Sequence, residues 1–370
     1  MRLNARPALA AQPWSWKGLR PPAQALANTI ARTFEREPLL HGRTPLTFLP
    51  RLSAAIGVEV LVKRDDFGDL AVAGSKMRKI ERIVAAARAA GCTTLVTAGP
   101  AQSNTARAVA VAASRAGLAS RIFLRAPAGA PLEGNALIAH MVGAEIVPCG
   151  MAPWPQIEAM GRAEALADPR ARWVPIGASD TAGVVGLAAG YLEMLEQLAE
   201  LDVQPSAIYH ASASGGLWAG LALAAHATTG PRPHPVAVIG DVYDDMPARY
   251  ASIYNGAAAA LGLTQRIEPA QVCLDWRGLA YAPYGEPAPA VLDALALAAR
   301  TEGLLAEYTY VGRALAVLIE DARAKRISGP VVLWHSGGLT SLMAADAQGV
   351  LAARSQSSPR VVAGALQRVQ

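Results

Sequence analysis

The chain has 370 residues, with 34 Lys and Arg against 29 Asp and Glu, and 52% of its residues are hydrophobic. This is the composition of a globular protein, and it excludes a largely disordered chain. The basic residues are scattered singly, so the net charge of +5 forms no run that could follow a phosphate backbone. We therefore expect no nucleic-acid partner.

Cysteine content and hydropathy exclude further classes. Cys92, Cys149 and Cys273 are far apart and form no C-x-x-C pair, so neither a disulfide framework nor a metal site is expected. No apolar run approaches the ~18 residues that a membrane span requires. Pro7 and Pro13 interrupt the apolar stretch near the N-terminus, which argues against a signal peptide. The expected setting is the cytoplasm.

Strand-like and helix-like segments alternate after an opening arm of about 37 residues that shows little periodicity. Strands are predicted at 58–63, 93–97, 121–125, 145–148, 207–211, 236–241 and 331–334, with a last edge strand at Val361 and Val362. Helices are predicted at 79–90, 135–142, 183–201 and 290–300. Two more are predicted, one from the caps Ser103 and Asn104 to residue 116 and one that starts at residue 217. This alternation predicts an α/β fold with mainly parallel sheets, in which ligands bind where loops leave the carboxyl ends of strands.

Lysine is rare, with only five in the chain, and Lys76 follows small residues at the start of a predicted helix. The positive end of a helix dipole lowers the pKa of an amine somewhat. An amine with a lowered pKa suits Schiff-base chemistry. Position alone favours a solvated lysine, so this signal needs support from other residues.

Three loops of small residues follow predicted strands. Gly99–Asn104 offers a hydroxyl, two amides and backbone N–H groups, which suit a carboxylate or a phenolate oxygen, although simple helix capping is equally consistent. Ser212–Gly216 can hold a phosphate on its backbone N–H groups, yet it is neither G-x-G-x-x-G nor a Walker A loop. The third loop, His335–Gly338, adds the hydroxyl of Ser336. An amine, a carboxylate site, a phosphate site and a hydroxyl together are what pyridoxal phosphate requires.

The ordered motifs carry a family resemblance over about residues 44–343. Gly74–Glu81 is similar to G-N-K-x-R-K-L-E, and Gln102–Arg107 is similar to Q-S-N-H-x-R. Ser212–Gly216 is similar to T-G-S-G-G, Tyr310–Leu315 to Y-T-G-K-A-L, and His335–Gly338 to H-T-G-G. The chain resembles the fold type II pyridoxal-phosphate enzymes of the tryptophan synthase β-like superfamily. Within them it resembles the D-cysteine desulfhydrase and 1-aminocyclopropane-1-carboxylate deaminase family.

The resemblance implies a role for each matched residue. Lys76 would hold the cofactor as a Schiff base and, once freed, would act as the base at Cα. Tyr284 and Tyr310 would lie near the substrate, Tyr310 as a second acid or base. Gln102, Ser103 and Asn104 would bind substrate, with Ser103 also assisting proton transfer and Asn104 also binding the phenolic oxygen of the cofactor. The remaining cofactor-binding residues implied are Ser212, Ala213, Ser214, Gly215, Gly216, Leu217 and Ser336.

The chain departs from the family pattern beside the ring nitrogen of the cofactor. The family's deaminases carry Glu at the position of Val311 and Leu at that of Ser336, whereas its desulfhydrases carry Thr at both. Ser336 alone would remain as a partner, and a hydroxyl holds a pyridinium proton poorly, so the ring would be a weaker electron sink. Thr105 and Leu217 also depart from the pattern, which leaves the substrate range open.

These observations predict two open, twisted, mainly parallel sheets flanked by helices, with pyridoxal phosphate in the cleft between two domains. The large domain would comprise 1–78 and 178–370, with 1–37 as its arm, and the small domain 79–177. The expected reaction is β-elimination on a small amino acid, possibly D-configured, in a homodimer that binds neither nucleic acid nor membrane. The alternatives are β-replacement, aminocyclopropane deamination, a nucleotide-binding α/β protein, and a catalytically idle relative.

Overall fold

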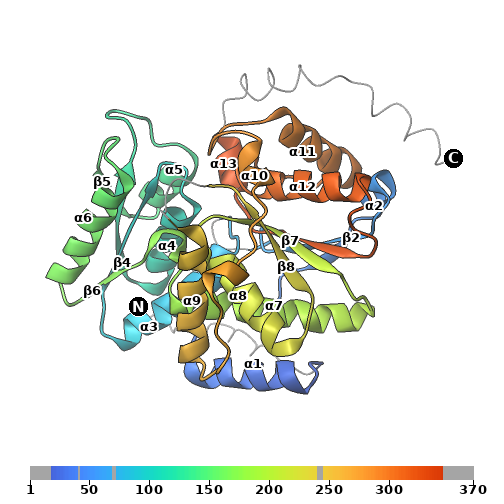
Figure 1. The fold of residues 1–370 in the computed structure, drawn as a ribbon. Coiled ribbons are helices and arrows are strands. Elements are labelled where there is room, and N and C mark those ends of the chain that lie inside the picture. Colours follow the sequence, from blue (N-terminus) through green and yellow to red (C-terminus); the bar gives the residue numbers. More distant parts are fainter. Residues whose placement is uncertain (1–17, 41, 69–71, 240–244, 345–370) are drawn as a thin grey trace, which may run out of the picture.

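A computed structural model describes residues 18–40, 42–68, 72–239 and 245–344, and it divides them between two β-sheets with helices on both faces of each (Figure 1). Nearly all strand pairs are parallel, so the predicted α/β class with two mainly parallel sheets is confirmed. None of the described helices combines the length and the apolar character needed to cross a membrane.

The larger sheet has the strand order β1-β2-β9-β7-β8. Its strands are β1 (Leu46–Phe48), β2 (Val60–Arg64), β7 (Ala207–Ser212), β8 (Arg232–Ala237) and β9 (Val331–His335). Only β1 runs antiparallel to its neighbour. The central strand β9 pairs with β2 from Val60 opposite Val331, and with β7 from Ala207 opposite the same residue. β9 is buried along its whole length, as expected of a strand covered on both faces.

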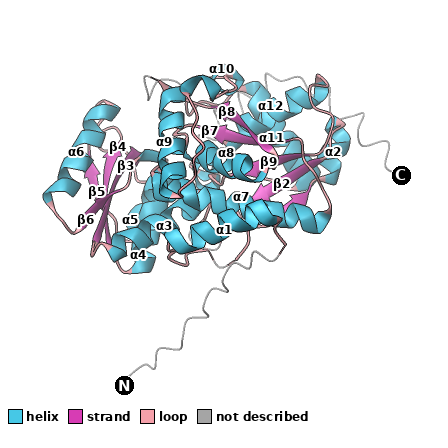
Figure 2. Cartoon of the chain, turned by 60° about the horizontal axis from the view of Figure 1, so that its bottom comes forward, coloured by secondary structure: helices cyan, strands magenta, loops and turns pink. Residues whose placement is uncertain are grey.

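Two groups of helices cover this sheet (Figures 1 and 2). One face packs against α2 (Pro50–Ile56), α11 (Pro289–Glu302) and α12 (Val311–Arg323). The other packs against α1 (Pro21–Thr33), α7 (Thr181–Leu201), α8 (Gly216–Thr228) and α9 (Met246–Ala260). The short elements η2 (Pro269–Gln271), α10 (Arg277–Ala280) and α13 (Leu339–Met343) lie in the connections.

The smaller sheet is wholly parallel, in the order β5-β4-β3-β6. Its strands are β3 (Thr94–Pro100), β4 (Ala119–Arg125), β5 (Glu145–Pro148) and β6 (Ala171–Trp173). Around it lie α3 (Lys76–Ala89), α4 (Asn104–Ala116), α5 (Gly134–Met141), α6 (Trp154–Ala167) and η1 (Ile176–Ala178). All of its strands fall within the predicted small domain, 79–177, whereas α3 begins three residues before that boundary.

The opening arm contains a helix that its sequence did not reveal. Pro21 and Pro22 begin α1, where the first turn tolerates proline because its N–H groups have no partner within the helix. Leu26 and Ile30 are then buried against α7 and α8. Part of the arm therefore packs against the helices that cover the larger sheet, and residues 1–17 lie outside the described part of the chain.

The edge strand β8 also differs from its prediction. It spans Arg232–Ala237, four residues earlier than the predicted start at 236. Pro233 and Pro235 concealed it, but an edge strand accepts proline because one side of its backbone needs no ladder partner. The end of the predicted segment, and the strand expected at Val361 and Val362, fall outside the described residues.

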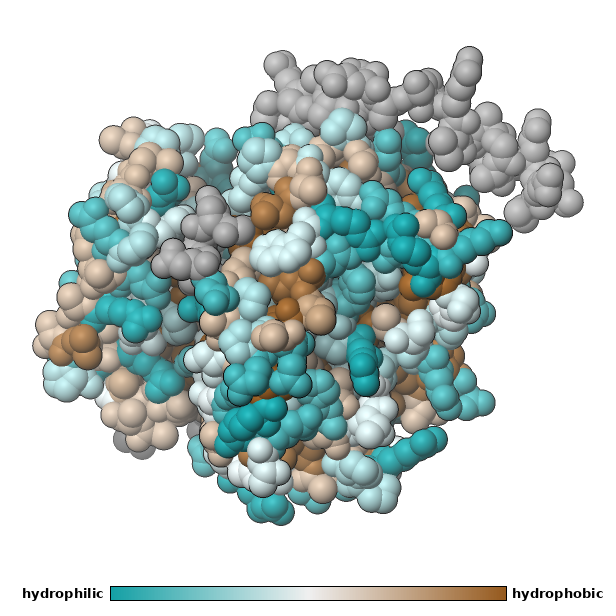
Figure 3. All heavy atoms as spheres, in the orientation of Figure 1, coloured by the Kyte–Doolittle hydropathy of each residue, from teal (hydrophilic) through white to brown (hydrophobic). Residues whose placement is uncertain are grey.

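Hydropathy varies over the face of the molecule seen in Figure 1. In the space-filling view, hydrophilic residues gather over the α12 side of the larger lobe, and a short hydrophobic band lies between them and the smaller lobe (Figure 3). This face therefore mixes polar and apolar residues, with the polar ones gathered on one side.

Candidate active site

A cavity of about 340 Å³ lies where the carboxyl ends of strands from both sheets meet. Pro100 and Arg125 end β3 and β4 of the smaller sheet, and Ser212 ends β7 of the larger one. All three line the cavity. Parallel α/β sheets bind ligands at this edge, and the volume lies within the range typical of small-molecule sites.

Lys76 lines this cavity as the first residue of α3. Burial and, to a lesser extent, the nearby charge of Arg107 lower the pKa of its amine to about 8, whereas Glu307 opposes the shift. The loop before Lys76 pairs with the loop after β9 through Gly74 and Gly337. A Cβ at Gly74, which has φ of 129°, would lie 2.7 Å from the carbonyl oxygen of Ser336. This close approach brings Lys76 and Ser336 into one cavity.

The loop between β3 and α4 places Ser103 and Asn104 at the cavity. Ser103 caps α4, because its Oγ accepts a hydrogen bond from the backbone N–H of Ala106 (3.1 Å). Gln102 turns elsewhere. Its Oε1 accepts from the backbone N–H of Asn135 (3.1 Å), its Nε2 donates to the carbonyl of Glu133 (3.2 Å), and it is absent from the described cavity lining. The substrate-binding role predicted for Gln102 therefore has no support from its position.

The glycine loop between β7 and α8 forms another wall. Its lining residues are Ser212, Ala213, Ser214, Gly215 and Leu217. Gly215 adopts φ of 86°, and a Cβ there would stand 2.4 Å from the ring of Tyr250, so glycine is required. Gly215 offers no side-chain cap to α8, which leaves the N–H groups of its first turn to an anion. Gly216 lies behind the lining as the first residue of α8.

Lys79 is a site residue that sequence reasoning passed over. Its Nζ donates to the carbonyl of Gly177 (2.7 Å) and to Oγ of Ser179 (3.1 Å), and it lines the cavity although its side chain is fully buried. A Cβ at Gly216 would lie 2.5 Å from this Nζ, so the lysine adjoins the glycine loop. Burial and the charge of Lys76 lower its pKa well below the ordinary value. The available signal was its spacing of three from Lys76, which puts both on one helix face.

Two tyrosines form the side of the cavity contributed by the C-terminal region. The hydroxyls of Tyr284 and Tyr310 are hydrogen-bonded to each other, and the rings meet edge to face with centroids 5.9 Å apart. Burial and the neighbouring Tyr284 raise the pKa of Tyr310 well above its usual value. Tyr310 is therefore protonated at neutral pH and can donate a proton or a hydrogen bond.

Ser336 and Val311 differ in their access to the cavity. Ser336 lines it, whereas Val311 is buried in the core between α12 and the larger sheet, outside the described lining. The buried carboxylate of Glu307, which sequence reasoning also passed over, accepts the backbone N–H groups of Thr309, Tyr310 and Val311. Burial raises its pKa to about 7 against these hydrogen bonds. Glu307 thus holds the start of α12, and Tyr310 with it.

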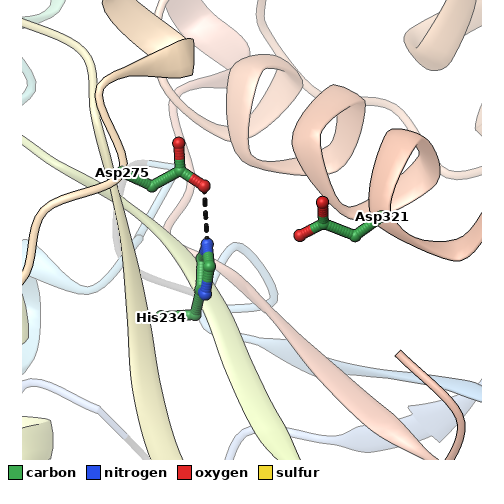
Figure 4. Close-up of side chains that lie close together, drawn as sticks. All are labelled: His234, Asp275 and Asp321. Carbon is green, nitrogen blue, oxygen red and sulfur yellow. Dashed lines mark hydrogen bonds and ion pairs between the residues drawn. The ribbon is translucent and has the colours of Figure 1, made fainter. Parts of the chain in front are cut away.

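A second polar cluster lies away from the cavity. His234, Asp275 and Asp321 come together from β8, the loop after η2, and α12, with His234 Nε2 2.8 Å from Asp275 Oδ2 (Figure 4). Arg277 pairs with both carboxylates, at 2.5 Å from Asp275 and 2.7 Å from Asp321, and the hydroxyl of Tyr209 donates to Asp321. Protein donors therefore occupy these oxygens, and we assign the cluster a structural role.

The cavity fits a phosphorylated aldehyde such as pyridoxal phosphate. The amine of Lys76 would bond to the aldehyde, and the glycine loop with Lys79 would hold the phosphate. Two observations support this fit. Gly215 and Gly216 leave no room for a Cβ, and Lys79 is a buried amine whose described hydrogen bonds go only to neutral oxygens. Because burial lowers the pKa of this amine well below its ordinary value, an anionic ligand beside it would favour the charged form.

Comparison with known proteins agrees with this fit. Residues 38–337 match the family described as "Pyridoxal-phosphate dependent enzyme". The chain is 35% identical to a D-cysteine desulfhydrase from Salmonella choleraesuis over 321 residues, which cover 84% of this chain and 96% of that protein. The structure of an ACC deaminase homologue has a TM-score of 0.78 and 27% identity, covering 87% of this chain and 96% of its own.

A more distant structure shares the fold alone. A threonine deaminase isoform from Solanum lycopersicum has a TM-score of 0.62 and 16% identity, over 90% of this chain and 89% of its own. The family match spans most of the chain, including the loops that form the cavity. The predicted cofactor, pyridoxal phosphate, is confirmed on this basis, and the chain belongs to the family of pyridoxal-phosphate-dependent enzymes.

Proposed function

We propose that this enzyme catalyses β-elimination from a small amino acid that carries a leaving group on Cβ, releasing ammonia and a 2-oxo acid, as a D-cysteine desulfhydrase does. The observation that carries this proposal is the joint placement of Lys76, Ser103 and Tyr310 on one cavity. They provide a base, a hydrogen-bonding hydroxyl and a protonated phenol within a single small-molecule site.

Each residue has a distinct task in this proposal. Bound pyridoxal phosphate supplies electron withdrawal from Cα. Lys76, with a pKa near 8, exchanges between its amine and ammonium forms near neutral pH, which suits removal of the Cα proton. Ser103 and Asn104 bind the α-carboxylate at the start of α4. Tyr310, held protonated and aligned by Tyr284, gives a proton to the departing group.

Val311 and Ser336 favour elimination over opening of a cyclopropane ring. An aminocyclopropane carboxylate has no Cα proton, so its reaction depends on a strong electron sink and a group that attacks or protonates the ring. Val311 offers no acidic partner for the cofactor ring, and Ser336 offers only a hydroxyl. Elimination needs only a short-lived carbanion, because the leaving group departs soon after deprotonation.

The test is 2-oxo acid release from β-chloroalanine of both hands and from D-cysteine, beside 1-aminocyclopropane-1-carboxylate. We expect β-substituted alanines to be turned over and the cyclopropane not to be. Faster turnover of the cyclopropane than of either β-chloroalanine would refute the reasoning from Val311 and Ser336. Formation of an S-substituted cysteine when a thiol is added, without 2-oxo acid release, would instead identify β-replacement. A homodimer and a cytoplasmic setting are part of the same proposal, and sedimentation of the purified protein tests the first.

A further inference from the structure

Arg125 and Trp154 form a polar and aromatic part of the cavity wall that none of the proposed roles uses. Arg125 is the last residue of β4 and Trp154 the first of α6, and both line the cavity from the side of the smaller sheet. Arg125 pairs in register with Pro100 at the end of β3. It therefore lies beside the loop that carries Ser103 and Asn104.

Contacts within the smaller domain hold the guanidinium of Arg125. Its Nε donates to the carbonyl of Ala152 (2.9 Å), and its Cζ lies 5.2 Å from the ring centroid of Trp154. Among the described residues, no carboxylate lies within ion-pair distance of it. Arg121, four residues earlier on the same strand, pairs with Glu145 and Glu164. The charge of Arg125 is thus held in place at the cavity without an acidic partner in the described chain.

The charges around the cavity show what Arg125 can bind. The described lining contains Lys76, Lys79 and Arg125 but no Asp or Glu. The fit to pyridoxal phosphate assigns Lys76 to the aldehyde and Lys79 to the phosphate, which leaves Arg125, on a different sheet, for another anion. Arginine binds carboxylates and phosphates through two parallel hydrogen bonds, and stacking on an aromatic ring fixes its plane for this purpose.

We propose, resting on the β-elimination function, that the natural substrate carries a second anionic group at or beyond Cβ, a carboxylate or a phosphate, and that Arg125 binds it. Trp154 acts as the positioning residue for the guanidinium. With a β-phosphate ester, Lys76 takes the Cα proton, the Cβ–O bond breaks, and phosphate leaves with the bonding electrons. Water then hydrolyses the released enamine to a 2-oxo acid and ammonia, with no net oxidation.

The first experiment compares substrates with and without a second charge. It measures kcat/KM for 2-oxo acid release from O-phosphoserine, 3-hydroxyaspartate and β-chloroalanine, each in both configurations, with the wild type, Arg125→Gln and Arg121→Gln. We expect the wild type to prefer at least one doubly anionic substrate. Arg125→Gln should lower that kcat/KM about tenfold or more, the value of a charge-assisted pair, and lower that of β-chloroalanine less. Arg121→Gln, outside the cavity, is the matched control and should change neither.

Two results of this experiment overturn the proposal. Equal losses for all substrates in Arg125→Gln would assign the arginine to the α-carboxylate. Turnover of β-chloroalanine but of no doubly anionic substrate would reject the second charge while leaving β-elimination intact.

If no substrate in the panel reacts, that result counts against β-elimination itself. A binding measurement then still tests the role of Arg125, because it does not depend on turnover. Calorimetry on the holoenzyme compares succinate with butyrate, two acids of equal carbon number that differ in one carboxylate. We expect succinate to bind about tenfold or more tightly than butyrate in the wild type, and this preference to be lost in Arg125→Gln. Equal affinity of the wild type for the two acids would refute the proposal.

Discussion

Lys76 and Lys79 stand one turn apart on α3 and line the same cavity, but their amines have different surroundings. Lys79 Nζ is hydrogen-bonded to the carbonyl of Gly177 and to Ser179 beside the glycine loop. Lys76 Nζ makes no hydrogen bond within the described part of the chain, so this amine is available to react in the cavity. Lys76 is therefore suited to cofactor attachment, and Lys79 to anion binding.

The first prediction concerns the site of cofactor attachment. Reduction of the holoenzyme with borohydride, followed by peptide mapping, should find the pyridoxyl group on Lys76. Lys79 should remain unmodified, because its amine is committed to two oxygen acceptors. A label on Lys79, or on neither lysine, would contradict both this assignment and the proposed base.

The second prediction concerns the pH dependence of cofactor loading. An amine attacks an aldehyde only when unprotonated, and burial lowers the pKa of Lys76 from 10.5 to about 8. The rate of pyridoxal phosphate attachment to the apoenzyme should therefore fall about tenfold per pH unit below pH 8 and level off above it. Stopped-flow absorbance between about pH 6.5 and about pH 9.5 measures this profile, with Lys76→Ala as the control that should show no attachment. A rate still rising steeply above pH 9 would indicate an unshifted lysine.

The third prediction concerns Lys79 as a phosphate ligand. Lys79→Met should weaken binding of pyridoxal phosphate about tenfold or more, the value of one hydrogen bond to a charged group. The same substitution removes a buried amine without an acidic partner among its described hydrogen bonds, so the apoenzyme should be equally stable or more stable. Cofactor titration and thermal unfolding of the apoenzyme measure the two effects, and the exposed Lys325→Met is the matched control. Lower apoenzyme stability with unchanged cofactor affinity would show a purely structural lysine.

Local chemistry decided which of these features could be predicted from sequence. Lys76, Ser103 and Gly215 lie at or next to helix starts. Helix starts can be recognised in a sequence, because capping residues and small residues such as glycine are favoured there. The fold class followed from alternating strands and helices in the same way. Roles for the individual site residues stay predictions, although the structure gathers most of them around one cavity.

Tertiary pairing decided what could not be predicted. In the sequence, Glu307 is a single acidic residue between Ala306 and Tyr308, and only the fold buries it under the start of α12. Arg125 reads as an ordinary residue at the end of a strand, and its lack of a described acidic partner depends on which elements surround it. The helix α1 depends on a face that becomes buried only when α7 and α8 are in place.

The fourth prediction concerns the buried ion network that holds α3. Arg78, between the two cavity lysines, donates to Asp65 and Glu193, and Glu193 also pairs with the fully buried Lys63. The indole of Trp334 on β9 donates to Asp65 (2.8 Å), which ties this network to the central strand of the larger sheet. The position of α3, and of both cavity lysines, therefore depends on Glu193.

Glu193→Ala leaves Arg78 with one carboxylate partner fewer and Lys63 without its bridging carboxylate. Removing one partner of a buried ion pair costs about 3–5 kcal/mol of unfolding free energy, because the remaining charge stays buried. Glu200 lies on the same helix as Glu193, and its exposed carboxylate pairs with Arg43. Glu200→Ala should therefore lower the unfolding free energy by at most about 1 kcal/mol. Chemical denaturation of both apoenzymes measures these values. A loss from Glu193→Ala no larger than that from Glu200→Ala would mean that the network does not stabilise α3, and the two lysines would need another anchor.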